Sequence, residues 1–158
     1  MPKQQASRAE FIRDNFATIW PVHLGAFTRL LTQLRTRFDG DLELMLVLAV
    51  IGERTRPETW TPELQTYRQL TRNSEDAHLQ HPINVQSVSD FSGIPRETVR
   101  RKVRILERKG WIVRDTDGRL SVSRTAGQDL EDATSDSIAY LETLFSVFER
   151  SAQDAGRT

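Results

Sequence analysis

Two stretches of regularly spaced apolar side chains, one near each end of the chain, most constrain how this protein can fold. Between residues 16 and 38 aromatic and leucine side chains recur every three or four residues, and the same spacing runs from Ile138 to Ala152. Such spacing puts the apolar side chains on one face of an α-helix, in the seven-residue repeat of helices that pair. The sequence therefore predicts two long amphipathic helices whose apolar faces need partners.

Stripes of this kind most often belong to an ordinary core. Here they lie outside the most strongly patterned part of the chain, so we expect part of them to bury against the apolar run Leu44–Ile51 and the rest against a second protomer. Phe38 and Ala152 end the two stripes. The residues assigned to a dimer interface are Trp20, Leu24, Phe27, Leu31, Leu34, Ile138, Leu141, Phe145 and Phe148.

The N-terminal half contains clear helix boundaries. Pro21 predicts a kink or break near residues 17–20, because proline removes a backbone hydrogen bond. Asp39-Gly40 ends the first long helix, and Asp41 can cap the next one. That helix contains Leu44–Ile51, which is apolar on all sides and is expected to be the buried central helix. Residues 53–82 hold three prolines and predict only a short helix from about Pro62 to Leu70.

The pattern is sharpest between residues 83 and 124. Asn84 can cap a short helix whose Val85, Val88 and Phe91 are expected to point inward, and Gly93 lies in the tight turn that follows. A longer helix is predicted over residues 95–109 and ends at Gly110. Two short strands, 111–114 and 120–123, flank an Asp-Gly hairpin signal at Asp117-Gly118. The last helix is expected from Thr125 to about Ala152, with a break near residues 133–135.

Charge is unevenly distributed along the chain although the formal net charge is zero. Residues 96–124 carry ten Lys or Arg against four Asp or Glu, whereas residues 125–158 carry two against seven. Electrostatic attraction acts over about a Debye length, so a basic face can attract a polyanion even when the total charge vanishes.

The string INVQSVSDFSGIPRETVRRKVRILERKGWIVRDTDGRLSVS, residues 83–123, resembles a winged helix-turn-helix. The resemblance covers about a quarter of the chain and implies DNA binding, with residues 95–109 as recognition helix in the major groove and the hairpin as wing on the minor groove or backbone. The terminal helices resemble the dimerisation helices of MarR-type regulators. The insertion at 53–82 is longer than the connection in that family, and the helix-turn-helix string is closer to IclR-type or GntR-type winged helices.

The helix at 95–109 supports this resemblance by its own chemistry. Val99, Val103 and Leu106 share one face, and several arginines share the opposite face. The arginine fork fits guanine or phosphate, whereas Glu97 can accept a hydrogen bond from a cytosine amine or orient a neighbouring arginine. A merely solvated basic face is the plainer interpretation. The candidate DNA-binding residues are Ser92, Arg96, Glu97, Thr98, Arg100, Arg101, Arg104, Arg108, Arg114 and Arg119.

Other functional classes find little support in the sequence. The absence of cysteine removes disulfides and thiolate metal sites, and no nucleophile, phosphate-binding or zinc-protease motif occurs, so we expect neither an enzyme nor a cofactor. His78 and His81, near Glu75 and Asp76, are better explained as a solvated loop than as a metal site. Six aromatic residues could line a pocket for an effector or could belong to an ordinary core, and the sequence supports both interpretations. They are Trp20, Phe27, Trp60, Tyr67, Tyr140 and Phe145.

We therefore expect a mainly α-helical fold with a small β-hairpin wing. The expected segments are helices for dimerisation and core (1–52), an insertion (53–82), the winged helix-turn-helix (83–124) and a C-terminal dimerisation helix (125–158). The expected function is that of a bacterial-type, cytoplasmic, homodimeric transcription regulator on double-stranded DNA, with no signal peptide and no membrane contact. The alternative is a winged-helix module that binds proteins without binding specific DNA.

Overall fold

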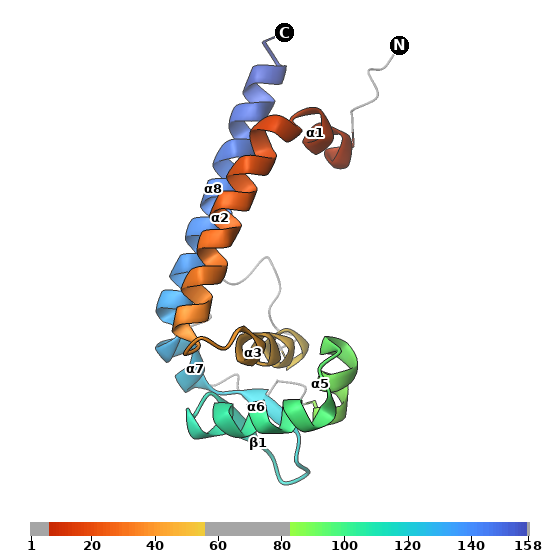
Figure 1. Cartoon of the computed structure of the whole chain (residues 1–158), viewed down its shortest axis with the longest axis vertical. Coiled ribbons are helices and arrows are strands. Elements are labelled where there is room, and N and C mark those ends of the chain that lie inside the picture. Colours follow the sequence, from red (N-terminus) through yellow and green to blue (C-terminus); the bar gives the residue numbers. More distant parts are fainter. Residues whose placement is uncertain (1–6, 56–82, 158) are drawn as a thin grey trace. The chain divides into compact units, whose positions relative to one another are not determined.

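The computed structural model describes residues 7–55 and 83–157. This part of the chain is mainly helical and contains a two-stranded antiparallel hairpin, which confirms the expected fold class at this level (Figure 1). The elements are α1 (Arg8–Asp14), α2 (Phe16–Arg37), α3 (Leu42–Thr55), α5 (Val85–Ser92), α6 (Arg96–Arg108), β1 (Ile112–Arg114), β2 (Leu120–Val122), α7 (Arg124–Asp129) and α8 (Glu131–Ala155).

The described residues fall into two compact units. The terminal-helix unit contains the residues up to Leu34 and those from Asp132 onward, and the central unit is Arg35–Glu131. Helix α3, which we grouped with the N-terminal helices on sequence, packs against α5, α6 and β2 in the central unit. The short helix expected from about Pro62 to Leu70 lies outside the described residues.

In the terminal-helix unit, the break near the start of the chain lies at Asn15 and not at residues 17–20 as expected. The Asn15 side chain and N–H both donate to the Phe11 carbonyl and close α1, whereas the Asn15 carbonyl accepts from Ile19 N–H and opens α2. Pro21 is inside α2. It lies in the second turn, where its missing N–H removes a single bond near the helix start, so α2 continues through it.

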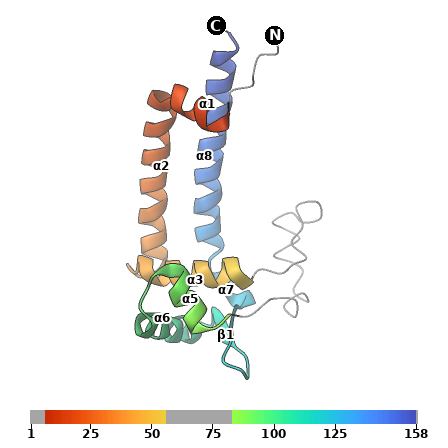
Figure 2. The same ribbon diagram turned by 90° about the vertical axis from the view of Figure 1, so that its right-hand side faces the viewer.

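Helices α2 and α8 run in opposite directions along the terminal-helix unit (Figures 1 and 2). They meet at Tyr140 of α8, whose hydroxyl lies 2.9 Å from Nδ1 of His23 and whose ring is 5.9 Å from that of Phe27. Ile19 and Leu30 of α2 and Val147 of α8 are buried. Each helix therefore has a narrow buried stripe, and much of the remaining apolar surface is exposed.

The central unit has a continuous apolar core formed by α3, α5, α6 and the hairpin. Phe38 joins this core, where its ring packs edge-on against Trp111, so the end of the first stripe buries with the Leu44–Ile51 run as expected. The expectation that α3 is buried all round is wrong, because Leu46 is 41% exposed. Leu44, Val47 and Ile51 form the inner face, and one helix face is all that α5, α6 and β2 cover.

Two further expectations in and next to the central unit are corrected. Phe91 does not point inward but is 59% exposed, with the Arg54 guanidinium 3.2 Å from its ring centre. With 3.6 residues per turn, Phe91 lies about a third of a turn away from Val85, at the edge of the face that Val85 and Val88 bury. The break in the last helical stretch lies at Leu130, between α7 and α8, and not near residues 133–135.

Asp41 anchors the start of α3 to α6. Its carboxylate caps α3 by accepting from Leu44 N–H at 2.9 Å, and it receives Lys102 Nζ of α6 at 2.5 Å. Burial opposes ionisation of this carboxyl, but the hydrogen bonds from Lys102 and from Leu44 N–H outweigh burial and hold the pKa of Asp41 below its ordinary value of 3.8. Ionised Asp41 therefore stabilises the fold.

We expect Asp41→Asn, which keeps an oxygen for the cap but loses the charge, to lower the free energy of unfolding by about 1 kcal/mol at pH 7. Because the pKa of Asp41 is lowered on folding, this contribution is complete above about pH 4 and is lost as pH falls through the folded pKa. Urea unfolding of both proteins from pH 7 to pH 3 measures the difference, with Glu53→Gln on the same helix as control. A difference that persists undiminished in acid contradicts the assignment.

Candidate nucleic-acid interface

A tight turn between α5 and α6 sets the start of the candidate recognition helix. Gly93 ends α5 with a φ of 73°, a conformation that favours glycine. The Ser92 hydroxyl donates to the Val88 carbonyl and accepts from Ile94 N–H, and the Ser89 hydroxyl donates to the Ile94 carbonyl. Ser92, a candidate DNA-binding residue on sequence, thus uses its hydroxyl within the turn itself.

Helix α6 has two chemically distinct faces. Val99, Val103 and Leu106 are completely buried, which confirms the inner face expected from the sequence. Thr98 and Arg100 lie at its flanks and are partly exposed. The exposed polar side chains of the helix are Arg96, Glu97, Arg101, Arg104 and Arg108. Five of the ten candidate DNA-binding residues are therefore exposed on α6.

Ion pairs divide the basic residues of 96–124 into two groups. Lys102 binds Asp41, with Glu43 at 3.6 Å, and Lys109 binds Asp39 at 2.7 Å. Arg100 pairs with Glu97. Arg114 pairs with Glu107. Within residues 7–55 and 83–157, the other arginines of this segment have no acidic partner; they are Arg96, Arg101, Arg104, Arg108, Arg119 and Arg124.

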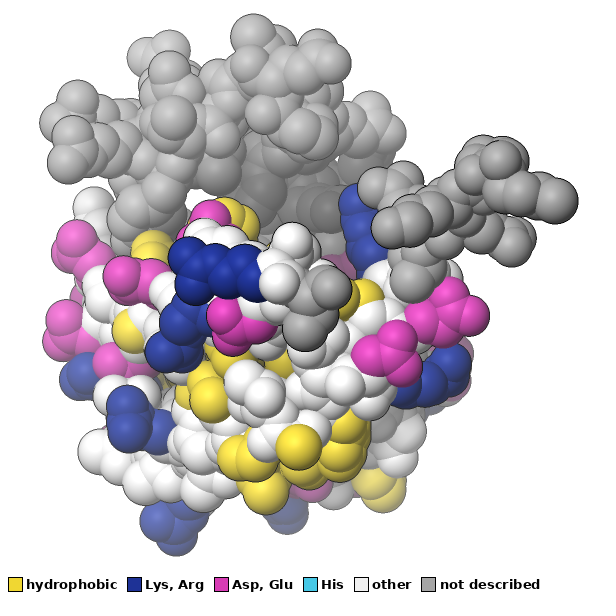
Figure 3. Space-filling model, turned by 90° about the horizontal axis from the view of Figure 1, so that it is seen from above, with side chains coloured by type: hydrophobic (Ala, Val, Ile, Leu, Met, Phe, Trp, Pro, Cys, Tyr) yellow, Lys and Arg dark blue, Asp and Glu magenta, His cyan; other side chains and the backbone are white. Residues whose placement is uncertain are grey.

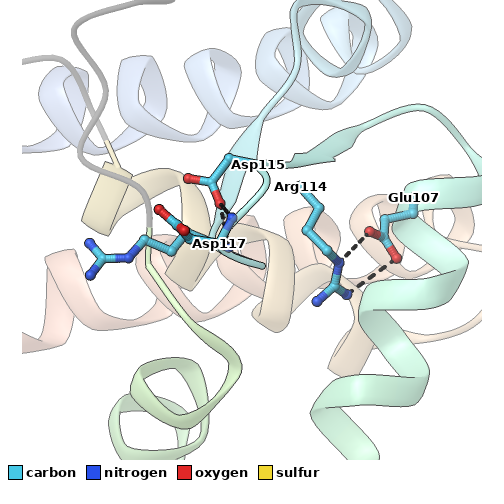
Figure 4. Close-up of polar contacts among 5 residues, drawn as sticks. Glu107, Arg114, Asp115 and Asp117 are labelled. Carbon is cyan, nitrogen blue, oxygen red and sulfur yellow. Dashed lines mark hydrogen bonds and ion pairs between the residues drawn. The ribbon is translucent and has the colours of Figure 1, made fainter.

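The hairpin after α6 is closed by local hydrogen bonds. Strands β1 and β2 pair with Arg114 opposite Leu120, and Gly118 has a φ of 77°, as the Asp-Gly signal predicts. One oxygen of Asp115 accepts from the N–H groups of Asp117 and Arg119, both at 2.9 Å (Figure 4). Ile83 adds an antiparallel bridge to Leu120. These bonds fix the backbone of Arg119 at the base of the turn, directly before β2.

Arg114 links this hairpin to α6. Its Nε and Nη2 donate to the two carboxylate oxygens of Glu107, at 2.9 and 3.4 Å (Figure 4). The hydrogen bond from Arg114 to Glu107 raises the pKa of Arg114 above its ordinary value, and the guanidinium stays charged. Of the two hairpin arginines proposed on sequence, Arg114 therefore contacts α6, whereas Arg119 is exposed and has no acidic partner among the described residues.

The polar contacts at the far end of α6 were not expected from the sequence. The Trp111 indole N–H donates to Asp129 of α7 at 2.9 Å, and Lys109 Nζ lies 4.9 Å from the Trp111 ring centre. The hydrogen bond from Trp111 to Asp129, like that from Lys102 to Asp41, joins residues distant in sequence. A buried tryptophan N–H usually needs an acceptor, so Trp111 itself was the sequence feature that could have predicted an acceptor nearby.

The remaining candidates from the sequence concern a metal site and an effector pocket. Residues 7–55 and 83–157 contain no cluster of three His, Cys, Asp or Glu able to hold a metal ion, and no helix among them is long and apolar enough to cross a membrane. Trp20, Phe27 and Tyr140 form an aromatic group around His23. The other candidates for a metal site or effector pocket, Glu75, Asp76, His78, His81, Trp60 and Tyr67, lie outside the described residues.

No known protein family, curated protein or solved structure matches this chain.

The positive φ of Gly118 allows a direct test of whether the hairpin turn depends on this glycine. Nothing lies within 4 Å of a Cβ at this position, so Gly118→Val acts on the backbone alone, at a cost of about 1–2 kcal/mol in the local conformation. We expect the loss to appear as faster amide exchange of residues 112–122 with little change in melting temperature. Gly127→Ala, a helical glycine with equally open surroundings, is the control. Unchanged exchange in the hairpin would show that its turn does not depend on Gly118.

Proposed function

We propose that this protein is a homodimeric transcription regulator that binds double-stranded DNA through α6. One observation carries the proposal: the outer face of α6 presents exposed arginines without an acidic partner in the described chain, whereas both lysines of the same region are paired with carboxylates. A basic helix that served only for solubility would have no reason to separate its cations in this way.

The geometry of the central unit supports a winged helix-turn-helix. Helices α3, α5 and α6, the Gly93 turn and the β1–β2 hairpin follow the order of that fold, and the bridge from Ile83 to Leu120 corresponds to its third, short strand. An α-helix fits the DNA major groove, and the arginine fork matches guanine or two phosphate oxygens. In this proposal α6 reads the major groove, and Arg119 reaches the minor groove or the backbone.

The exposed apolar surface of the terminal-helix unit supports the homodimer. Of the large hydrophobic side chains exposed in the described residues, eight of eleven belong to this unit. A view along α2 and α8 shows apolar side chains gathered between charged ones (Figure 3). Leu141 is 61% and Phe145 64% exposed, and Trp20, Leu24, Phe27 and Ile138 are exposed as well. Soluble monomers rarely leave such contiguous surface uncovered.

A dimer also fits the proposed DNA site. Two-fold proteins read operators as paired half-sites about one DNA turn, roughly 34 Å, apart. Such a regulator would occupy a roughly palindromic site and block or recruit polymerase, in the cytoplasm of a bacterial-type cell. The MarR-like use of the terminal helices is part of this proposal.

Arg101 and Arg104 are the arginines whose removal tests DNA binding most directly. We expect Arg101→Ala with Arg104→Ala to weaken specific binding by about 1–3 kcal/mol for each arginine that hydrogen-bonds a base. If both arginines bind phosphates, the slope of the logarithm of the binding constant against the logarithm of the salt concentration (the salt slope) becomes shallower by roughly one for each residue. Fluorescence anisotropy against duplex DNA over a salt series measures both effects.

The matched control removes two exposed arginines of the terminal-helix unit, Arg13→Ala with Arg150→Ala. Equal affinity and equal salt slope in wild type and in the α6 variant would reject the interface. A wild type that binds no duplex at low salt would instead favour a module for protein contacts.

The dimer is tested at the centre of its proposed interface. We expect Leu141→Glu with Phe145→Glu to convert the dimer into a monomer near 18.1 kDa, because each buried carboxylate would lose its hydration. Ser146→Glu with Gln153→Glu adds the same charge on another face of α8 and should leave the dimer intact. Sedimentation at micromolar concentration distinguishes the species. A wild type that sediments as a monomer rejects the dimer.

A further inference from the structure

Glu97 is the one acidic side chain on the exposed face of α6, and its surroundings are unusual. Its side chain is 80% exposed in the first turn of the helix, with the exposed cations Arg96 and Arg101 nearby in sequence. Its Oε1 accepts a hydrogen bond from Nη1 of Arg100, which holds the carboxylate in place. Among the described residues no hydrogen bond to Oε2 is formed, so this oxygen remains able to accept one.

A carboxylate at this position opposes binding to phosphates. A surface that attracted DNA only by charge would bind it more tightly without Glu97, since each negative group repels the backbone. The first turn of a recognition helix is also the part that reaches base edges. Glu97 therefore makes sense in a DNA complex if a base donates a hydrogen bond to it.

Base chemistry then selects cytosine. In the major groove cytosine presents its N4 amine as a donor, whereas guanine presents two acceptors and thymine an acceptor with a methyl group. Adenine has a donor at N6 but an acceptor at the adjacent N7, which would face the second carboxylate oxygen. From this we propose, resting on the proposed function, that Glu97 is a specificity-determining residue that requires cytosine at one position of each half-site. Arg100 is its positioning residue.

A structural role for Glu97 predicts something different. Helix α6 has no side-chain cap, because Pro95 occupies the N-cap position, and a carboxylate in the first turn stabilises a helix start. In that case removal of the charge lowers the stability of the helix and leaves the preference for bases unchanged. The two roles are therefore separated by base preference and not by stability.

The test is selection of bound duplexes from a random pool at physiological salt, with the full chain and with Glu97→Gln and Glu97→Ala. We expect the wild-type motif to contain one cytosine per half-site at a position that becomes adenine with Glu97→Gln, because glutamine pairs with adenine. With Glu97→Ala the position should lose its preference while the rest of the motif stays. Direct titration should show about tenfold discrimination for wild type and almost none for Glu97→Ala.

The control is Glu53→Gln, which removes an exposed carboxylate that also pairs with a neighbouring arginine, Arg54, but on α3. It should give the wild-type motif. A motif that is the same in wild type and both Glu97 variants overturns the inference and leaves the proposed function intact. Wild-type binding without any motif overturns the inference alone, and absence of DNA binding overturns both.

Discussion

The burial of one face of α6 against the core determines the rest of the central unit. Val99, Val103 and Leu106 are fully buried, and Lys102 fixes the helix to Asp41 at the start of α3. With rotation about the helix axis fixed in this way, Arg101 and Arg104 have to face solvent. The same packing brings Glu107 beside Arg114, so the orientation of the hairpin also depends on how α6 is seated.

The terminal helices differ from α6, because residues 7–55 and 83–157 leave much of their apolar surface exposed. Helices α2 and α8 meet through His23, Phe27 and Tyr140, and each has exposed apolar residues next to its buried ones. On α8, Leu141 and Phe145 lie on a different face from Val147, a third of a turn or more around the helix axis. A second apolar face on a helix that already buries one is what packing against a second neighbour requires.

Local interactions were predictable from sequence, and distant ones were not. The Asn84 and Asp41 caps and the positive φ of Gly118 depend on a few adjacent residues, and the structure confirms them. The two faces of α6 follow from helix periodicity alone. The partners of its cations do not, since Lys102 meets a carboxylate 61 residues away. The expectation that Phe91 points inward is wrong because an eight-residue helix has a narrow inner face. Hydrophobicity alone does not show which of its apolar residues lie on that face.

The division between lysine and arginine on this surface has a chemical reason. An ammonium is a compact, strongly hydrated charge, and both lysines bind carboxylates: Lys102 binds Asp41 with Glu43 nearby, and Lys109 binds Asp39. A guanidinium is planar, more weakly hydrated and able to donate in pairs, which suits phosphates and guanine edges. Because different residues hold α6 in place and face outward from it, we expect Arg104→Ala to alter the proposed DNA binding while Lys102 and Lys109 keep the helix in place.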